Sequence, residues 1–193
     1  MASLSIAVIL SFFSIRMALA ARAADQRTAE GLRAAVRSEP QNAEYWYRYG
    51  HFEQFNLEQT DPAQAKELFK RATVLDPKFT DAWLDLATSY ELEGDMEEAK
   101  DAYLHAKKSY PASPDVSWRY GNFLLRQGDI EGAYPEFRLA LTADPGRAAS
   151  AFSRCYRANP NVEQILDQIL PPIPSAYVGI IRETSDTKQI AVA

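Results

Sequence analysis

The fold is decided by residues 80–113, which read TDAWLDLATSYELEGDMEEAKDAYLHAKKSYPAS. Apolar residues recur every three or four positions on both sides of the turn Glu93-Gly94-Asp95, which is the pattern of two amphipathic helices. The small and bulky residues of this stretch recur in the sequences before and after it. A repeat of this length indicates a helical solenoid, in which each hairpin buries its faces only against its neighbours.

Helical patterns continue on both sides of this stretch, and each pair of helices closes at a proline. The closing prolines Pro77, Pro111 and Pro145 are spaced 34 residues apart. The turns within the pairs are short, which makes the two helices of a pair antiparallel neighbours. The predicted pairs are residues 43–55 with 63–75, residues 81–92 with 96–110, and residues 115–126 with 130–143.

The pattern resembles the tetratricopeptide repeat family, whose period is 34 residues. In that family, aromatic and small residues stand at fixed positions before a closing proline. The repeat at residues 80–113 has all of them: Trp83, Leu86, Ala87, Tyr90, Ala99, Tyr103, Ala106 and Pro111. Two departures stand out. Ser117 occupies an aromatic position with Trp118 one place late, and the turn of the first repeat is three residues longer than the pattern.

The resemblance implies an all-α fold: a right-handed α-solenoid of antiparallel helix hairpins, with three full repeats and partial capping repeats. The three repeats are residues 43–79, with a loop expected to bulge at the long turn, residues 80–113 and residues 114–147. On the N-terminal side, residues 1–23 form a signal peptide or membrane anchor, and residues 24–42 a half-repeat whose helix (26–38) lacks its first partner. On the C-terminal side, residues 148–170 are expected to form a degenerate repeat or cap. Residues 171–193 are expected to form a proline-rich spacer, a short helix at 175–182 and a tail, and this tail either packs on the solenoid or hangs free.

The N-terminal segment is apolar and uncharged from residue 3 to residue 15, where Arg16 follows. As a signal peptide it would be cleaved after Ala20 or Ala23, but it lacks the preceding basic region. As an anchor, residues 2–21 have about the length of a membrane span, and this interpretation is slightly favoured. A soluble packing helix is the third possibility. We therefore expect a membrane-associated or exported protein, of undecided orientation.

Charge disfavours a nucleic-acid partner. The net charge of the chain is −5, and residues 43–147 hold 12 Lys and Arg against 19 Asp and Glu. An acidic solenoid repels phosphate backbones, so we expect no binding of DNA or RNA. The single cysteine, Cys155, cannot form an internal disulfide and is expected to be a half-buried structural thiol.

The residues that usually perform catalysis or bind cofactors form no recognisable site. His51 and His105 lie on different repeats, with no Cys or acid at metal-ligand spacing. The glycines form no phosphate-binding loop. The acidic run from Glu91 to Glu98 lacks the calcium-loop pattern and is expected to be a solvated face. We therefore predict no enzyme activity, no metal and no cofactor.

A protein-binding groove is the remaining candidate site. In a solenoid of the family that this chain resembles, the first helices of the repeats line the concave side. The residues expected to point there and bind are Tyr47, Arg48, His51, Leu84, Asp85, Thr88, Trp118, Arg119, Asn122 and Arg126. Their mixture suits an extended peptide or a partner helix, with Tyr47 and Trp118 as anchors and the arginines as polar contacts. Alternatively, Tyr47 and Trp118 only cover neighbouring helices.

One family subtype can be tested by residue. Repeats that hold chaperone C-termini place Lys, Asn and Arg at clamp positions, where this chain has Tyr47, His51, Asp85, Asp115 and Arg119. Only Arg119 fits, and the two aspartates would repel a carboxylate. We therefore predict a scaffold for a protein or peptide partner that does not bind such tails. The alternative is a structural subunit of a larger envelope or membrane complex, with the groove permanently occupied or unused.

Overall fold

The computed structural model describes residues 2–56 and 60–186, and all regular structure within them is helical. The α-helices are α1 (Ala2–Asp25), α2 (Ala29–Ser38), α3 (Ala43–Phe55), α4 (Pro62–Leu75), α5 (Thr80–Glu93), α6 (Met96–Ser109), α7 (Pro114–Arg126), α8 (Ile130–Ala143), α9 (Ala148–Ala158), α10 (Val162–Ile169) and α11 (Pro174–Asp186), with a short 3-10 helix, η1 (Pro145–Arg147), before α9. The expected all-α class is confirmed.

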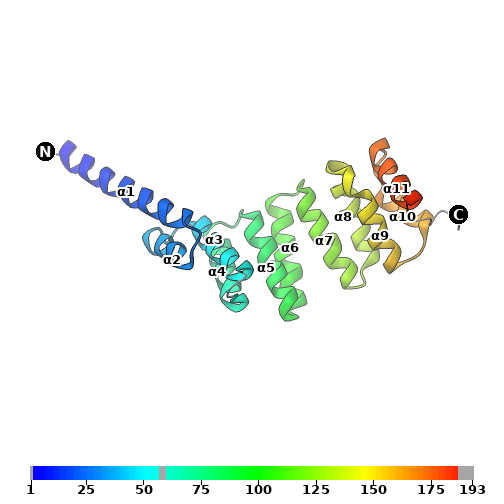
Figure 1. Cartoon of the computed structure of the whole chain (residues 1–193), viewed down its shortest axis with the longest axis horizontal. Helices are drawn as coiled ribbons and strands as arrows, with labels where there is room; N and C mark the ends of the chain where they lie inside the picture. Colours follow the sequence, from blue (N-terminus) through cyan, green and yellow to red (C-terminus); the bar gives the residue numbers. More distant parts are fainter. Residues whose placement is uncertain (1, 57–59, 187–193) are drawn as a thin grey trace. The chain divides into compact units, whose positions relative to one another are not determined.

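The chain forms two compact units, residues 1–109 with α1–α6 and residues 110–193 with α7–α11. Within them, α3 pairs with α4, α5 with α6 and α7 with α8, as antiparallel hairpins (Figure 1). The bounds of α3 and α8 are those predicted, and the other repeat helices differ by a residue at their ends. Residues 57–59 of the loop expected to bulge in the first repeat lie outside the described residues.

Local capping explains why the helix ends could be predicted. The side chains of Asp61, Ser113 and Asp129 accept hydrogen bonds from the first-turn backbone amides of α4, α7 and α8. The turns that end α5 and α7 contain Gly94 at φ +89° and Gly128 at φ +79°. This left-handed conformation strains residues with a Cβ, so glycine allows each helix to stop and reverse.

Close helix packing within the hairpins depends on small residues. A Cβ atom at Gly50 would lie 2.8 Å from ring atoms of Phe69 and 3.2 Å from the carbonyl oxygen of Ala65. At Gly121, it would lie 3.2 Å from Cβ of Glu136. Gly50 therefore faces Ala65 and Phe69 across the hairpin, because only glycine lets α3 approach α4 this closely.

Two tryptophans at the same repeat position make the same hydrogen bond. The indole Nε1–H of Trp46 donates to the carbonyl oxygen of Pro40 at 3.0 Å, and that of Trp83 donates to Pro77, also at 3.0 Å. In the third repeat this position is Ser117, which is fully buried and whose Oγ has no partner in the described part of the chain. Each indole thus ties its helix to the loop that precedes it, and the third repeat lacks this tie.

The N-terminal half-repeat has a partner helix, contrary to the prediction that its first helix is missing. The last turns of α1 pack on α2, burying Ala20 and Ala24 with Leu32 and Ala35. A Cβ at Gly31 would lie 2.2 Å from the carbonyl oxygen of Ala23, so this approach is also close. The sequence pattern missed the pairing because α1 is apolar on nearly all sides and shows no single packing face.

The N-terminal part of α1 projects beyond α2 (Figure 1). Its large apolar side chains from Ile6 to Leu19 are exposed, among them Val8 at 64% and Phe12 at 63%. Within residues 2–56 and 60–186, none of the helices is both long and apolar enough to cross a membrane.

The C-terminal cap consists of the predicted pair, α9 and α10, followed by α11. α10 packs on α8, and α11 packs on α9 and η1. Ala176 and Ile180 of α11 are buried, so this helix, longer than the predicted 175–182, folds back on the second unit. The end of the tail, residues 187–193, lies outside the described residues.

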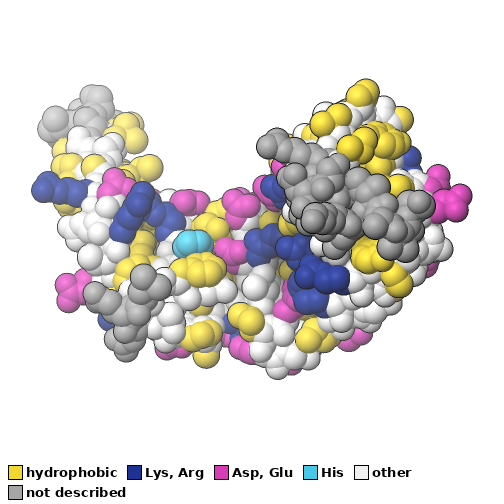
Figure 2. Space-filling model, turned by 45° about the vertical axis from the view of Figure 1, so that its right-hand side comes forward, with side chains coloured by type: hydrophobic (Ala, Val, Ile, Leu, Met, Phe, Trp, Pro, Cys, Tyr) yellow, Lys and Arg dark blue, Asp and Glu magenta, His cyan; other side chains and the backbone are white. Residues whose placement is uncertain are grey.

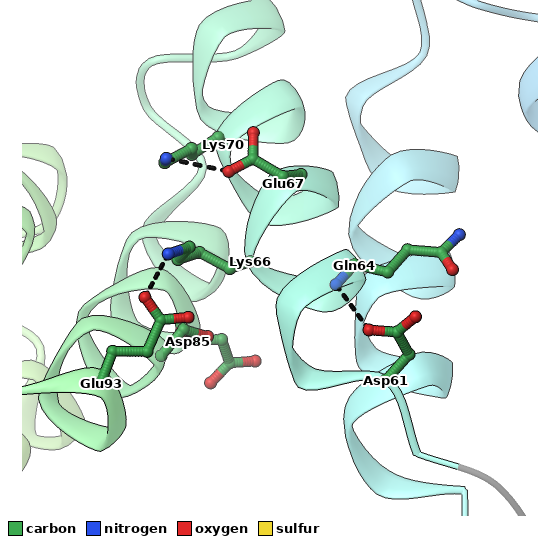
Figure 3. Close-up of polar contacts among 8 residues, drawn as sticks. Asp61, Gln64, Lys66, Glu67, Lys70, Asp85 and Glu93 are labelled. Carbon is green, nitrogen blue, oxygen red and sulfur yellow. Dashed lines mark hydrogen bonds and ion pairs between the residues drawn. The ribbon is translucent and has the colours of Figure 1, made fainter.

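An ion pair links the first two repeats on the side of the acidic run, and a second ion pair lies within α4. Lys66 on α4 pairs with Glu93 at the end of α5, and Lys70 pairs with Glu67 at 3.0 Å (Figure 3). The ammonium groups of Lys66 and Lys70 also lie 5.7 Å and 5.5 Å from the centre of the Tyr90 ring. Part of the acidic run therefore contributes to packing between α4 and α5.

Candidate interaction surfaces

The first unit contains an open pocket of about 570 Å³ beside α3, which we call the α3 pocket. Three of the predicted groove residues, Tyr47, Arg48 and His51, lie in it together. Its remaining lining comes from the end of α1, the loop after it, α2 and α3: Asp25, Arg27, Leu32, Glu44 and Phe52. The lining is mixed in polarity, with acids, arginines and aromatic rings in one concavity.

Arg48 has a structural role in addition to lining the pocket. Its Nη2 donates to the carbonyl oxygen of Ala24 at 2.8 Å and lies 3.5 Å from Oδ1 of Asp25. A guanidinium at this place satisfies a carbonyl at the C-terminal end of α1 and complements the helix dipole there. Arg48 therefore holds α1 to α3 and forms part of one wall of the α3 pocket.

Tyr47 belongs to a row of aromatic rings along α3. Its ring centre lies 4.8 Å from that of Phe79, 5.8 Å from Phe69 and 6.0 Å from His51. His51 in turn lies 4.6 Å from Phe55, which is 55% exposed. Figure 2 shows a histidine at the surface with hydrophobic side chains next to it. This row offers flat apolar surface to a partner at its exposed end.

The three candidates on α5 contribute little exposed surface. Leu84 is 3% exposed and Asp85 is 9% exposed. Asp85 accepts a hydrogen bond from the hydroxyl of Tyr47 at 3.1 Å, and Thr88 donates from Oγ1 to the carbonyl oxygen of Leu84 at 3.1 Å. The prediction that Leu84 and Asp85 point into an open groove needs correction, because both side chains are used in packing within the first unit.

In the second unit, Trp118 contacts three elements. Its ring meets Phe137 of α8 edge to face at 5.4 Å, and the guanidinium carbons of Arg147 and Arg154 each lie 5.4 Å from its centre. Trp118 remains partly exposed. The alternative that Trp118 covers neighbouring helices is thus partly correct, since it joins α7 to α8, η1 and α9.

The remaining candidates on α7 differ in exposure. Asn122 is 8% exposed and donates from Nδ2 to the carbonyl oxygen of Trp118 at 2.6 Å, so its amide is used within α7. Arg119 is partly exposed, and Arg126 is exposed. Both arginines take part in further interactions within the protein.

Sequence reasoning missed Phe79, Arg147 and Arg154. Phe79 comes just before α5, and the two arginines lie in η1 and α9, outside the helices expected to line a groove. A repeat signature reports residues that pack between consecutive helices, so it does not indicate side chains reaching in from a loop or a degenerate repeat. The arginine content of residues 147–157 was the available signal.

Among the described residues, no cluster of three or more His, Cys, Asp or Glu could hold a metal ion. The ring of His105 stacks on Trp83 at 4.3 Å with an interplanar angle of 11°. Tyr103 donates to Glu91 of the acidic run at 2.6 Å. These side chains are occupied in stabilising the second repeat.

Cys155 is expected to be unreactive in the folded protein. It is fully buried, more than the half-buried thiol predicted, and burial raises the pKa of its thiol from 9.0 to about 12. The thiolate fraction near pH 8 is then roughly a thousandfold lower than in the unfolded chain. Labelling with 5,5′-dithiobis(2-nitrobenzoate) should be negligible in native protein and stoichiometric in urea. Rapid native labelling would contradict this burial.

The same shift gives a pH dependence with a definite sign. The pKa of the thiol is higher in the folded chain than in the unfolded chain. The buried neutral thiol therefore stabilises the folded state fully below pH 9. This stabilisation of the folded state is lost as the pH rises from 9 to about 12. A Cys155→Ser variant should show a smaller loss of stability over this range than the wild-type chain, measured by urea unfolding.

Comparison with known proteins agrees with this architecture. Two family models, both described as tetratricopeptide repeat, match residues 56–117 and residues 101–148. A TPR repeat-containing protein of Dictyostelium discoideum is 30% identical over 125 residues, which are 60% of this chain and 46% of that protein. The anaphase-promoting complex subunit CDC16 of Saccharomyces cerevisiae is 37% identical over 49 residues, 25% of this chain and 6% of CDC16. The chain thus spans less than half of these relatives.

Solved structures with the same fold include MamA, with a TM-score of 0.66 and 15% identity over 94% of this chain and 96% of MamA. YrrB, a TPR protein with an unusual peptide-binding site, has a TM-score of 0.58 and 19% identity over 79% of this chain and 81% of YrrB. PilW, a type IV pilus biogenesis factor, has a TM-score of 0.60 and 17% identity over 82% of this chain and 69% of PilW. At these identities the likeness concerns the fold. Residues 56–148 of this all-helical chain are therefore similar to tetratricopeptide repeats in sequence, and the fold is that of solved tetratricopeptide repeat proteins.

Proposed function

We propose that this chain is a non-enzymatic protein-interaction scaffold whose α3 pocket binds an extended segment or a helix of a partner protein. The observation that supports this most directly is the pocket itself, about 570 Å³, open, and lined by Tyr47, Arg48 and His51. Its size is within the range of small binding sites, and its mixture of rings and charges suits a peptide. The peptide-binding site of YrrB supports the proposal at the level of the fold.

Because His51 is exposed and lines the α3 pocket, binding of a partner at this pocket can be tested by crosslinking from residue 51. A photo-crosslinking amino acid at residue 51 should capture a protein partner in cells. The same amino acid at residue 105 is the matched control, because His105 is also an exposed histidine but stacks on Trp83 of the second repeat. Capture of the same proteins with equal yield at both positions would contradict the proposal, as would no capture at residue 51.

The captured partner is then purified and its affinity measured. We expect His51→Asp to weaken binding by roughly tenfold, because it adds a carboxylate to a pocket that Glu44 and Asp25 also line and removes a ring from the aromatic row. His105→Asp should leave the affinity unchanged. Equal effects of the two substitutions would show that binding lies elsewhere.

The proposal includes a membrane-associated location. The large apolar side chains between Ile6 and Leu19 are exposed, which suits a segment that contacts lipid. Cleavage after Ala20 or Ala23 would remove α1 from Leu32 and Ala35, so packing favours retention of the segment. We expect the cellular protein to keep residues 1–23 and to leave the membrane fraction only with detergent. An N-terminus at Ala21 or Ala24 in a soluble exported fraction would refute this.

A structural subunit is the second candidate function. The face of α11 that does not pack on α9 exposes Val178 at 62% and Ile181 at 61%. Exposed apolar residues at an end of the described chain are typical of a surface that a further subunit covers. In that case the isolated chain should self-associate with rising concentration in size-exclusion chromatography, and Val178→Asp should prevent it.

A further inference from the structure

The side of α1 that is turned away from α2 carries an exposed apolar stripe. Its members recur at intervals of three and four residues, which places them on one face of the helix, and each is between 60% and 64% exposed: Val8, Phe12, Ile15 and Leu19. Ala20 and Ala24, on the other side of the helix, are fully buried in the contact with α2. The stripe therefore stays uncovered even where α1 is packed on α2.

A second side of α1 is apolar and exposed as well. Leu10 and Met17 are seven residues apart, so they share a face of the helix, and they are 61% and 56% exposed. At 3.6 residues per turn, this face lies nearly opposite Phe12 and Leu19. The helix of a second copy of this chain would cover one of the two faces and leave the other in water, whereas lipid covers both. The exposed side chains of α1 therefore favour lipid as their partner.

Two arginines of α1 lie next to these apolar side chains, and they differ in charge balance. Nη2 of Arg16 lies 3.5 Å from Oε1 of Glu39, so the charge of Arg16 is balanced within the protein. Arg22 is exposed, and in the described part of the chain its side chain has no ion pair and no hydrogen bond. The nearby carboxylate of Asp25 lies 3.5 Å from Nη2 of Arg48. Arg22 is therefore a cation without a counter-charge at the end of the apolar stripe.

The spacing of these residues along α1 matches one leaflet of a bilayer. Val8 and Leu19 are roughly 17 Å apart along the helix axis, at 1.5 Å per residue. The hydrocarbon of one leaflet is about 15 Å thick, half of the core of a bilayer. Arg22 stands three residues after Leu19 and continues the same face of the helix. This face thus presents an apolar length equal to one leaflet and then a cation at the level of the headgroups.

We propose that α1 contacts an anionic phospholipid surface, with the stripe from Val8 to Leu19 among the acyl chains and the guanidinium of Arg22 donating to an anionic headgroup. A guanidinium donates two parallel hydrogen bonds to phosphate oxygens, and a negatively charged surface attracts it more strongly than a neutral one does. The inference rests on the proposed membrane-associated location, and it specifies the chemistry of the lipid and the residue that recognises it.

The test uses the full chain, made by cell-free translation in the presence of vesicles and recovered by flotation. One set of vesicles is phosphatidylcholine alone, and the other contains equal parts of phosphatidylcholine and phosphatidylglycerol. We expect binding to the anionic vesicles to be roughly fivefold tighter, and high salt to remove the difference. Equal binding to both sets would overturn the proposal and leave the membrane-associated location in place. Absence from both sets would contradict that location as well.

Charge variants then test the role of Arg22. Arg22→Gln should weaken binding to the anionic vesicles by roughly fivefold and leave binding to phosphatidylcholine unchanged. Lys100→Gln is the matched control, because Lys100 is an exposed cation on α6 that has no ion pair in the described residues. Equal losses for the two variants would show general attraction to the charge of the chain and would refute the contact of Arg22 with a headgroup.

A second pair of variants tests the apolar stripe. Leu19→Asp should weaken binding to both sets of vesicles by roughly tenfold, because it places a carboxylate among acyl chains. Leu104→Asp is its control, since Leu104 is 43% exposed on α6, and it should bind like the wild-type chain. Wild-type binding by Leu19→Asp would refute the stripe. So would a chain that does not float and that self-associates through Leu19, because the occupant would then be a second copy.

Discussion

Replacing Phe69 by alanine is expected to lower the free energy of unfolding by about 3–5 kcal/mol. The ring is 0% exposed and packs with Ala65 and Leu86, so it joins α4 to α5 within the first unit. Tyr47 of the α3 pocket also lies against it. The substitution leaves a cavity that helices tied by Lys66–Glu93 cannot fully close. Urea unfolding followed by circular dichroism at 222 nm measures the effect.

Phe55→Ala provides the control for this prediction. Phe55 is 55% exposed at the end of α3, so its removal should change the free energy of unfolding by less than about 1 kcal/mol. Similar effects of Phe69→Ala and Phe55→Ala would mean that Phe69 does not form the buried contact between α4 and α5.

Gly50→Ala is expected to destabilise the chain by about 1–3 kcal/mol, although alanine normally favours helix. The new methyl group would lie 2.8 Å from the Phe69 ring and 3.2 Å from the Ala65 carbonyl oxygen, so α3 must move away from α4. The α3 pocket lies beside this contact, and we expect weaker partner binding as well. The same urea measurement gives the change in stability.

Gly179→Ala is the matched substitution. Gly179 lies within α11, where the nearest atom to an added Cβ would be Cβ of Ala148 at 3.9 Å, an ordinary contact. This variant should be neutral or gain up to about 1 kcal/mol from helix propensity. A second check combines Gly50→Ala with Phe69→Leu, where the smaller side chain makes room for the methyl group. Strictly additive losses in that double variant would argue against a direct clash.

Helix positions could be predicted because their signals are local. Asp61, Ser113 and Asp129 cap helix starts, and the glycines Gly94 and Gly128 allow the turns. Each signal acts within a few residues of the chain. It can therefore be recognised in the sequence without knowing which helices pack against each other. The capping repeat formed by α9 and α10 corresponds to residues 148–170, which were predicted to be a degenerate repeat or cap.

The candidate site was predicted less well, since exposure depends on residues far away in the chain. Tyr47, Arg48 and His51 do share a pocket, but its other wall comes from Asp25 and Arg27 beside α1. The repeat position of Asp85 suggested an open groove, whereas the hydroxyl of Tyr47 occupies its carboxylate. The position of a residue within a repeat predicts on which face of its helix the side chain lies. It does not predict which side chains from other helices cover that face.

By itself, the sequence determined the repeat: the spacing of Pro77, Pro111 and Pro145, the small residues at helix contacts and the helix ends, all set by short-range sterics and hydrogen bonds. The tertiary structure alone decided which side chains are left for a partner. In it, Ala20 and Ala24 pack on α2, and the guanidinium groups of Arg147 and Arg154 lie against the ring of Trp118. The physical reason is that burial and charge pairing are sums over all neighbours of a side chain, and most of those neighbours are distant in sequence.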